Sequence, residues 1–98
     1  MSTVITFALN DVTFDQIAQR GVPNADCAEA LARAEKIAGP RSHVVVSCSL
    51  AVAHDLREWF AMARRLVTAV GDTDRARACT DAVDQIDEAV RRARAPRT

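Results

Sequence analysis

The chain of 98 residues lacks an excess of charge of either sign, because 13 basic residues balance 13 acidic ones. A neutral chain produces no overall field that would gather nucleic acid or anionic lipid, so any such contact would depend on a local patch. The chain also lacks an uninterrupted apolar segment near the length of a membrane span, and its N-terminus has no basic run before a long apolar stretch. We therefore expect a cytoplasmic protein.

Glycine and cysteine are scarce, and neither clusters. The three glycines stand singly, without the spacing that phosphate-binding loops require. The three cysteines, Cys27, Cys48 and Cys79, are odd in number and widely spaced, which argues against a disulfide framework and favours buried thiols. With no Cys-x-x-Cys pair and no histidines paired at helical spacing, we predict neither a metal site nor a cofactor.

The second half of the chain contains two runs of apolar residues with the same spacing. Steps of four and three residues alternate, which is the repeat that keeps one helix face turned toward a partner helix. Gly71 and Asp72 separate the two runs, as a C-terminal glycine and the next helix's capping residue would, so we predict an antiparallel helical hairpin. Ala53, Phe60 and Val67 widen the apolar arc of the first helix, so it should also touch the N-terminal half. The predicted seam comprises Val52, Leu56, Trp59, Ala63, Leu66 and Val70, then Ala76, Cys79, Val83, Ile86, Val90 and Ala93.

The first half begins with an alternating pattern over residues 3–9, which is the period of a strand. Thr13, with Gln16 three residues later, has the pattern of a capping box and predicts a short helix that ends at Gly21. A second helix is expected to start at Asn24 or Asp26 and to end at Gly39 and Pro40. Its apolar face is mostly alanine, with Cys27, Leu31, Ala34 and Ala38 on one stripe and Ala30 and Ile37 beside it.

Three consecutive valines predict a second strand over residues 43–49, paired with residues 3–9. A parallel pairing would need a right-handed crossover through the two intervening helices. Alternatively, the valines begin the long helix or form an extended link.

These elements predict an α-dominated α+β fold in one domain spanning residues 1–98. Residues 1–42 would hold a strand and two short helices, and residues 43–98 a short strand and the long hairpin, so that the N-terminal unit contains one or two short strands. An all-α helical bundle is the alternative. With 49% apolar residues, the chain should bury about two-thirds of its unfolded surface.

No arrangement of residues assembles a catalytic site, so our leading hypothesis is a non-enzymatic interaction module that acts as adaptor, regulator or inhibitor. Its hairpin would bind another protein or a second copy of the chain as a homodimer. Met62 and Ala69 fall on the outer column of the first hairpin helix near Arg65, and we predict the partner contact there.

A nucleic-acid-associated regulator is the first alternative, because Arg91, Arg92 and Arg94 form a basic end. Residues 13–33 have the outline of a helix-turn-helix motif. The second helix of that motif would begin with Asp26 and an acidic first turn, which repels phosphate, so nucleic-acid binding is not expected through these helices.

A small cysteine-dependent enzyme is the second alternative. Cys48 precedes the long helix, whose N-terminal amides could lower the pKa of the thiol, and His54 follows six residues later. Six residues on one helix place the two side chains on different sides, so the spacing favours a structural thiol and no catalytic residue is assigned.

Overall fold

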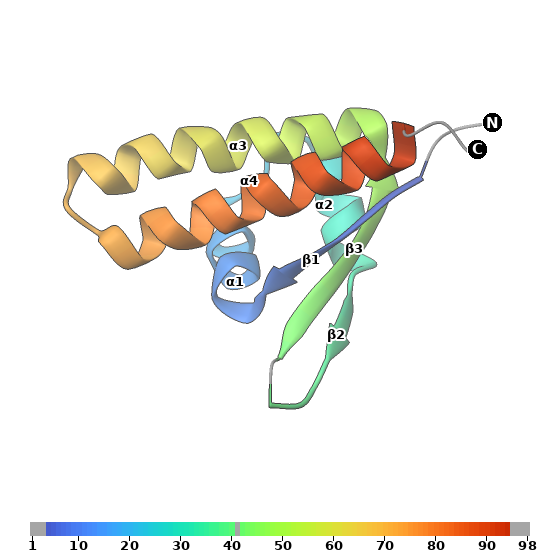
Figure 1. Ribbon diagram of the computed structural model, residues 1–98, viewed down its shortest axis with the longest axis horizontal. Helices are drawn as coiled ribbons and strands as arrows, with labels where there is room; N and C mark the ends of the chain where they lie inside the picture. The colour runs from blue at the N-terminus through green and yellow to red at the C-terminus, as the bar shows by residue number, and fades with distance from the viewer. Residues whose placement is uncertain (1–3, 41, 95–98) are drawn as a thin grey trace.

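The computed structural model describes residues 4–40 and 42–94, which form a three-stranded sheet and four helices (Figure 1). The fold is α-dominated α+β, as predicted, and not the alternative all-α bundle. In chain order the elements are β1 (Val4–Asn10), α1 (Asp11–Arg20), α2 (Ala25–Ala32), β2 (Glu35–Ile37), β3 (His43–Ser49), α3 (Leu50–Ala69) and α4 (Thr73–Arg94).

The sheet has the order β1-β3-β2, and both pairings are antiparallel. β1 and β3 pair along their full lengths, from Val4 opposite Ser49 to Asn10 opposite His43. The strand over residues 43–49 and its pairing partner are therefore confirmed, whereas the parallel arrangement with a right-handed crossover is wrong. β2 and β3 form a hairpin at the end of this segment, which turns β3 to run opposite to β1.

The third strand was not expected. α2 ends at Ala32 rather than at Gly39, and residues 35–37 pair with the free edge of β3. The alanine-rich end of the predicted helix could bury little apolar area, whereas the exposed edge of β3 offers backbone hydrogen-bond partners to an extended segment. Tertiary pairing therefore overrides the local helical pattern, and Ile37 lies in a strand.

Along β1 and β3 the side chains alternate between the solvent face and the core face of the sheet, as the two-residue period of a strand requires. On the solvent face, the Thr6 and Ser47 hydroxyl oxygens lie 3.1 Å apart in a directly opposed pair. The other face joins one hydrophobic core with residues of all four helices. The sheet contributes Ile5, Phe7, Leu9, Val44, Val46 and Cys48 to this core, and the helices contribute among others Ile17, Leu31, Leu56, Phe60 and Ile86.

Asn10, and not Thr13, caps α1. The Asn10 Oδ1 accepts hydrogen bonds from both the backbone N–H and the hydroxyl of Thr13, each at 2.7 Å. Thr13 is 1% exposed, so its hydroxyl needs an internal partner and finds it in the capping side chain. The sequence pattern placed the cap three residues too late, because Asn10 ends β1 and begins the helix at once. The side chain of Gln16 lies outside the part that the structure describes.

The turn of the helical hairpin forms as predicted. Gly71 has φ +79°, and two backbone bonds close the turn, from Gly71 N to Thr68 O at 3.0 Å and from Asp72 N to Val67 O at 2.9 Å. This is the Schellman motif, in which a glycine takes the left-handed position after the helix. The Asp72 Oδ1 then accepts from the N–H of Arg75 at 3.1 Å and caps α4.

The hairpin is longer than the sheet that it covers. In Figure 1 its turn extends at the left beyond α1 and the sheet, while the start of α3 and the end of α4 lie near the strands. The molecule measures 44 × 28 × 27 Å, so the hairpin sets its long axis. The turn half of α3 is consequently the part of the helix with the fewest elements around it.

Candidate functional site

The outer side of α3 carries exposed apolar side chains. Met62, Leu66 and Val70 are 57%, 59% and 80% exposed, and each follows the previous one by four residues. Residues four apart lie above one another on one side of a helix. Met62, Leu66 and Val70, the residue that caps the C-terminus of α3, therefore form a continuous line, which we call the α3 stripe. Single exposed apolar residues are ordinary, but three large ones in line mark a surface for interaction.

The seam prediction is wrong at Leu66 and Val70. The seam is confirmed at Val52, Leu56 and Ala63, which are buried. In the turn half of α3, Phe60 and Val67, which were predicted to widen the apolar arc, are buried as well. A straight α-helix turns once in 3.6 residues, so an alternation of four and three drifts away from the contact line unless the helices supercoil. The sheet and the N-terminal helices also turn the buried side of α3 toward Phe60, which leaves the end of the predicted seam in solvent.

The seam of α4 is confirmed at its centre and wrong at its end. Cys79, Val83 and Ile86 are buried, whereas Ala93 is exposed. The buried side of α4 also includes three alanines, at 78, 82 and 89, which let the helix approach its neighbours closely. Each hairpin helix therefore meets more than one element, and its buried side is wider than a two-helix seam.

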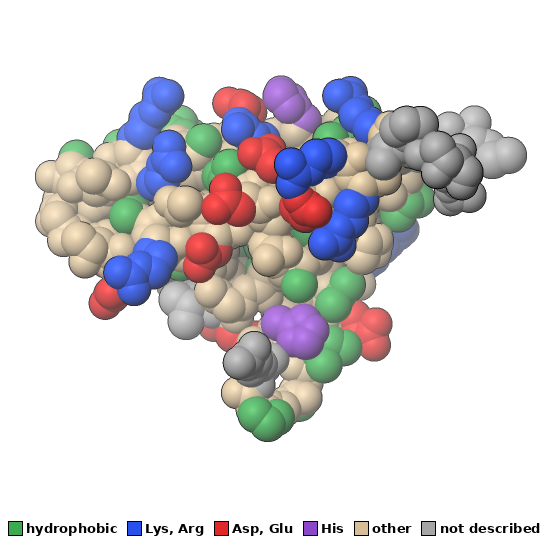
Figure 2. Space-filling view, viewed as in Figure 1, with side chains coloured by type: hydrophobic (Ala, Val, Ile, Leu, Met, Phe, Trp, Pro, Cys, Tyr) green, Lys and Arg blue, Asp and Glu red, His purple; other side chains and the backbone are tan. Residues whose placement is uncertain are grey.

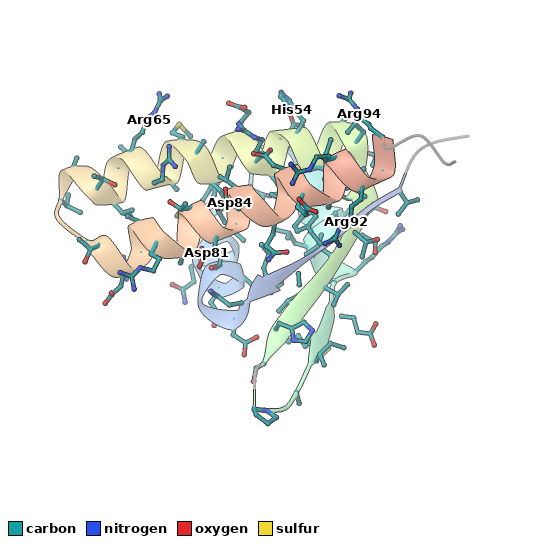
Figure 3. All side chains as sticks on the ribbon, in the orientation of Figure 1. His54, Arg65, Asp81, Asp84, Arg92 and Arg94 are labelled. Carbon is teal, nitrogen blue, oxygen red and sulfur yellow. The ribbon has the colours of Figure 1, made fainter. Side chains whose placement is uncertain are left out.

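The three residues that we predicted for the partner contact on α3 are all exposed. Met62 belongs to the α3 stripe, and Arg65 and Ala69 flank it. Figure 3 shows Arg65 pointing away from α4 and the sheet. Leu66 and Val70 were missed because their spacing assigned them to the seam. The width of the apolar arc could have revealed them, since α3 carries more apolar columns than one buried face can hold.

Charged side chains beside the α3 stripe are separated by sign along the helix. Asp55 and Glu58 precede Met62, and Arg65 follows it. The Asp55 Oδ2 accepts from Nδ2 of Asn24 at 2.9 Å, and Glu58 is 3.1 Å from Arg57 on the same helix. Arg65 takes part in none of the ion pairs found among residues 4–40 and 42–94. Acidic side chains therefore precede Met62 along the helix, and a basic side chain lies beside the stripe between Met62 and Leu66.

An open groove of about 510 Å³ lies between α3 and the segment that leads into α2. Trp59 lines this groove and is half-buried, packed edge-on against Phe60 with 5.2 Å between ring centroids and 88° between ring planes. Core packing thus fixes an aromatic side chain beside the start of the α3 stripe. The groove is lined by Pro23, Asn24, Asp55, Glu58, Trp59, Ala61, Met62 and Arg65.

The C-terminal arginines do not join this surface. Arg91 and Arg92 both form ion pairs with Glu88 on their own helix, with 3.2 Å between the Arg92 Nε and the Glu88 Oε1. Arg94 lines a separate groove of about 660 Å³ with His54, at the end of the hairpin opposite its turn (Figure 3). On the face seen in Figure 2, basic and acidic side chains are interspersed over the hairpin. The residues predicted to bind a partner therefore lie in two separate places, on the outer side of α3 and at the C-terminal end of α4.

Cys48 faces the core from β3 and is 9% exposed. Burial, with a smaller contribution from the nearby Cys27 thiol, raises the pKa of Cys48 to about 11. His54 stands on the exposed side of α3 (Figure 3). A thiol that is protonated at neutral pH and enclosed by apolar groups is the opposite of the exposed thiolate that nucleophilic catalysis uses.

The described part of the chain contains neither a cluster of metal-ligating side chains nor a helix suited to span a membrane. Within residues 4–40 and 42–94, no three histidine, cysteine or carboxylate side chains come together as a metal site would require. None of the helices in the same ranges combines the length and apolar content needed to cross a bilayer. No known protein family, curated protein or solved structure matches the chain. The candidate site therefore rests on the geometry of α3.

Proposed function

We propose that this protein is a non-enzymatic interaction module that binds an amphipathic helix along the α3 stripe. The observation that carries the proposal is the line of Met62, Leu66 and Val70 along α3 and its C-cap, each more than half exposed. Apolar residues at such spacing are the anchors through which one helix recognises another. A helix laid along the stripe would cover all three side chains at once.

The charges beside the stripe support one direction for the bound helix. Glu58 lies before Met62 and Arg65 lies after it. A partner helix with the same order of charges is complementary when it runs antiparallel, because its basic end then meets Glu58 and its acidic end meets Arg65. Fixed charges of this kind select the partner and its orientation more than they add to affinity.

The cysteines support our proposal of a cytoplasmic setting. Cys27, Cys48 and Cys79 are all free thiols and all buried. Small proteins of oxidising compartments tend to use cysteine in disulfides, whereas reduced buried thiols are typical of the cytoplasm. In that setting the module would act as adaptor, regulator or inhibitor.

The two alternative functions, a nucleic-acid-associated regulator and a cysteine-dependent enzyme, have less support from the side chains. Glu88 accompanies both Arg91 and Arg92, which reduces the local positive charge that phosphate binding would need. The raised pKa of Cys48 disfavours the thiolate that a cysteine enzyme would need at neutral pH.

Site-specific photo-crosslinking in the cells of origin tests the proposal. A photoreactive amino acid replaces Leu66 in one strain and Asp84, which is exposed on α4, in a control strain. We expect an adduct from position 66 that is absent from position 84 and that maps to an amphipathic helical segment.

That segment, made as a peptide, should bind the purified chain and lose at least tenfold in affinity to the Met62→Glu variant. Equal adducts at the two positions, or equal affinity of the peptide for the wild type and the Met62→Glu variant, would contradict the proposal. Circular dichroism confirms in each case that the variant is folded.

A further inference from the structure

We infer that the helix bound along the α3 stripe is α3 of a second copy of this chain, packed antiparallel about a two-fold axis near Met62. The inference rests on the proposed function and names its partner. Three relationships along α3 carry it, and each concerns residues on the surface already described.

The first relationship is the placement of opposite charges about Met62. Glu58 lies four residues before Met62 and Arg65 lies three residues after it. A two-fold axis perpendicular to the helix at this point sets Glu58 within one residue of the second copy's Arg65, and it makes the same pair again on the other side. Each copy thereby supplies an ionic partner to Arg65, which has none among the ion pairs of residues 4–40 and 42–94.

The second relationship concerns the two flanks of Met62 around the helix. Glu58 and Arg65 are seven residues apart and lie on one flank, since two helical turns take 7.2 residues. Trp59 and Leu66 are also seven apart and lie on the opposite side of Met62 around the helix, where Leu66 continues the stripe. Antiparallel pairing about a two-fold axis sets each flank against the same flank of the second copy, so charges meet charges and apolar side chains meet apolar ones. Parallel pairing would set the charged flank against the apolar flank, which is unfavourable.

The third relationship concerns the groove. Val70 lies eight residues after Met62, so the symmetric arrangement places the second copy's Val70 beside position 54 of the first chain. His54 does not line the groove of about 510 Å³, but its neighbour Asp55 does, so the second copy's Val70 comes to the edge of that groove. Val70, at 80% exposed the most exposed of the large apolar side chains described, would thus be partly covered at the edge of a concave surface. The zero net charge of the chain adds no long-range repulsion between two copies.

Sedimentation equilibrium of the full chain, with charge exchanges at the two paired positions, tests the inference. We expect the wild type to form a dimer. Glu58→Arg and Arg65→Glu, each alone, should raise the dimer Kd at least tenfold, because each sets like charges against one another. The double variant should restore the dimer, since the exchanged charges pair again. Asp84→Arg, an exposed exchange on α4, is the matched control and should leave the Kd unchanged.

A wild type that sediments as a monomer at every concentration up to its solubility limit overturns the inference. The inference is also overturned if neither single exchange changes the dimer Kd, or if the double variant does not restore the Kd of the wild type. These results leave the proposed function to its own test: an adduct at position 66 with a different protein supports that function while the second-copy inference fails. An adduct with the mass of two chains supports both, and no adduct above the control contradicts both.

Discussion

Arg57 of α3 and Asp87 of α4 form a two-point ion pair that links the helices of the hairpin. The Arg57 Nε lies 2.6 Å from the Asp87 Oδ1, and its Nη2 lies 3.4 Å from the Asp87 Oδ2. The hydrogen bond that the Arg57 guanidinium donates to the Asp87 carboxylate is the main cause that raises the pKa of Arg57. Sequence spacing alone would pair Asp87 with Arg91, four residues on. The structure uses Asp87 across the helix interface instead, where it fixes how α3 and α4 are aligned.

Removal of this ion pair should weaken the fold slightly. Both side chains are more than a third exposed, so solvent screens the attraction, and we expect Asp87→Ala to lower the free energy of unfolding by about 0.5–1 kcal/mol. A double-mutant cycle with Arg57→Ala, read from urea unfolding, measures the coupling. The matched control is the Glu29–Arg33 pair within α2, which is more exposed and should show a coupling near zero. Equal couplings for the two pairs would contradict a special role for Arg57 and Asp87.

Phe60 and Trp59 are neighbours in the chain, but their replacement by alanine should lower the free energy of unfolding by different amounts. Phe60 is fully buried at the centre of the core, so Phe60→Ala should lower the free energy of unfolding by about 3–5 kcal/mol. Trp59 is half-buried, and Trp59→Ala should cost clearly less while it weakens binding along the α3 stripe. Thermal and urea unfolding of the two variants provide the comparison. A larger loss of stability from Trp59→Ala would show that the tryptophan, and not Phe60, holds the hairpin on the sheet.

Asn10 and Asn24 cap α1 and α2 through the same hydrogen bond, from the backbone N–H three residues later to the asparagine Oδ1, but their loss should have different consequences. Asn10→Ala removes the acceptor of the Thr13 N–H and also leaves the buried Thr13 hydroxyl without its partner. We expect a loss of about 2–3 kcal/mol, the sum of a cap and an unsatisfied buried group. Asn24→Ala removes the cap bond to the Cys27 N–H and an exposed bond to Asp55, and should cost about 1 kcal/mol. Equal losses in chemical unfolding would mean that the Thr13 hydroxyl finds another partner.

Alkaline pH should destabilise the fold through Cys48. The unfolded thiol loses its proton near its ordinary pKa of 9.0, whereas the folded thiol keeps it until about pH 11. Between these values the unfolded state binds fewer protons, so the free energy of unfolding falls as pH rises, by about 2–3 kcal/mol over the window. Below pH 9 this contribution is fully present. The chain has no tyrosine, so no phenol side chain titrates in this window.

Urea unfolding at several pH values between 8 and 11 measures this effect. Cys48→Ala should flatten the dependence on pH, although it leaves the part that arises from the raised pKa of Cys27. Val46→Ala removes a buried neighbour on the same strand without a titrating group, so it should lower stability equally at all pH values. A Cys48→Ala variant with the slope of the wild type would show that the folded thiol has an ordinary pKa.

Local patterns were sufficient for the elements whose information lies within a few residues. The alternation in β1, the consecutive valines of β3 and the glycine with its following aspartate between the hairpin helices each led to an element found in the structure. Met62, Arg65 and Ala69 were also correctly expected on the surface, because their column carries few apolar residues. In these cases the periodicity of one strand or helix decides which side faces the core.

Tertiary structure alone decided where α2 ends, that β2 exists, and which columns of α3 are buried. A free edge of β3 is needed before Glu35–Ile37 can prefer an extended form over a helical one. α3 carries apolar residues around a wide arc, and the position of the sheet determines that Phe60 and Val67 are covered while Leu66 and Val70 remain exposed. A sequence specifies which side chains avoid water, but a helix with more apolar columns than its neighbours can cover leaves the choice among them to packing.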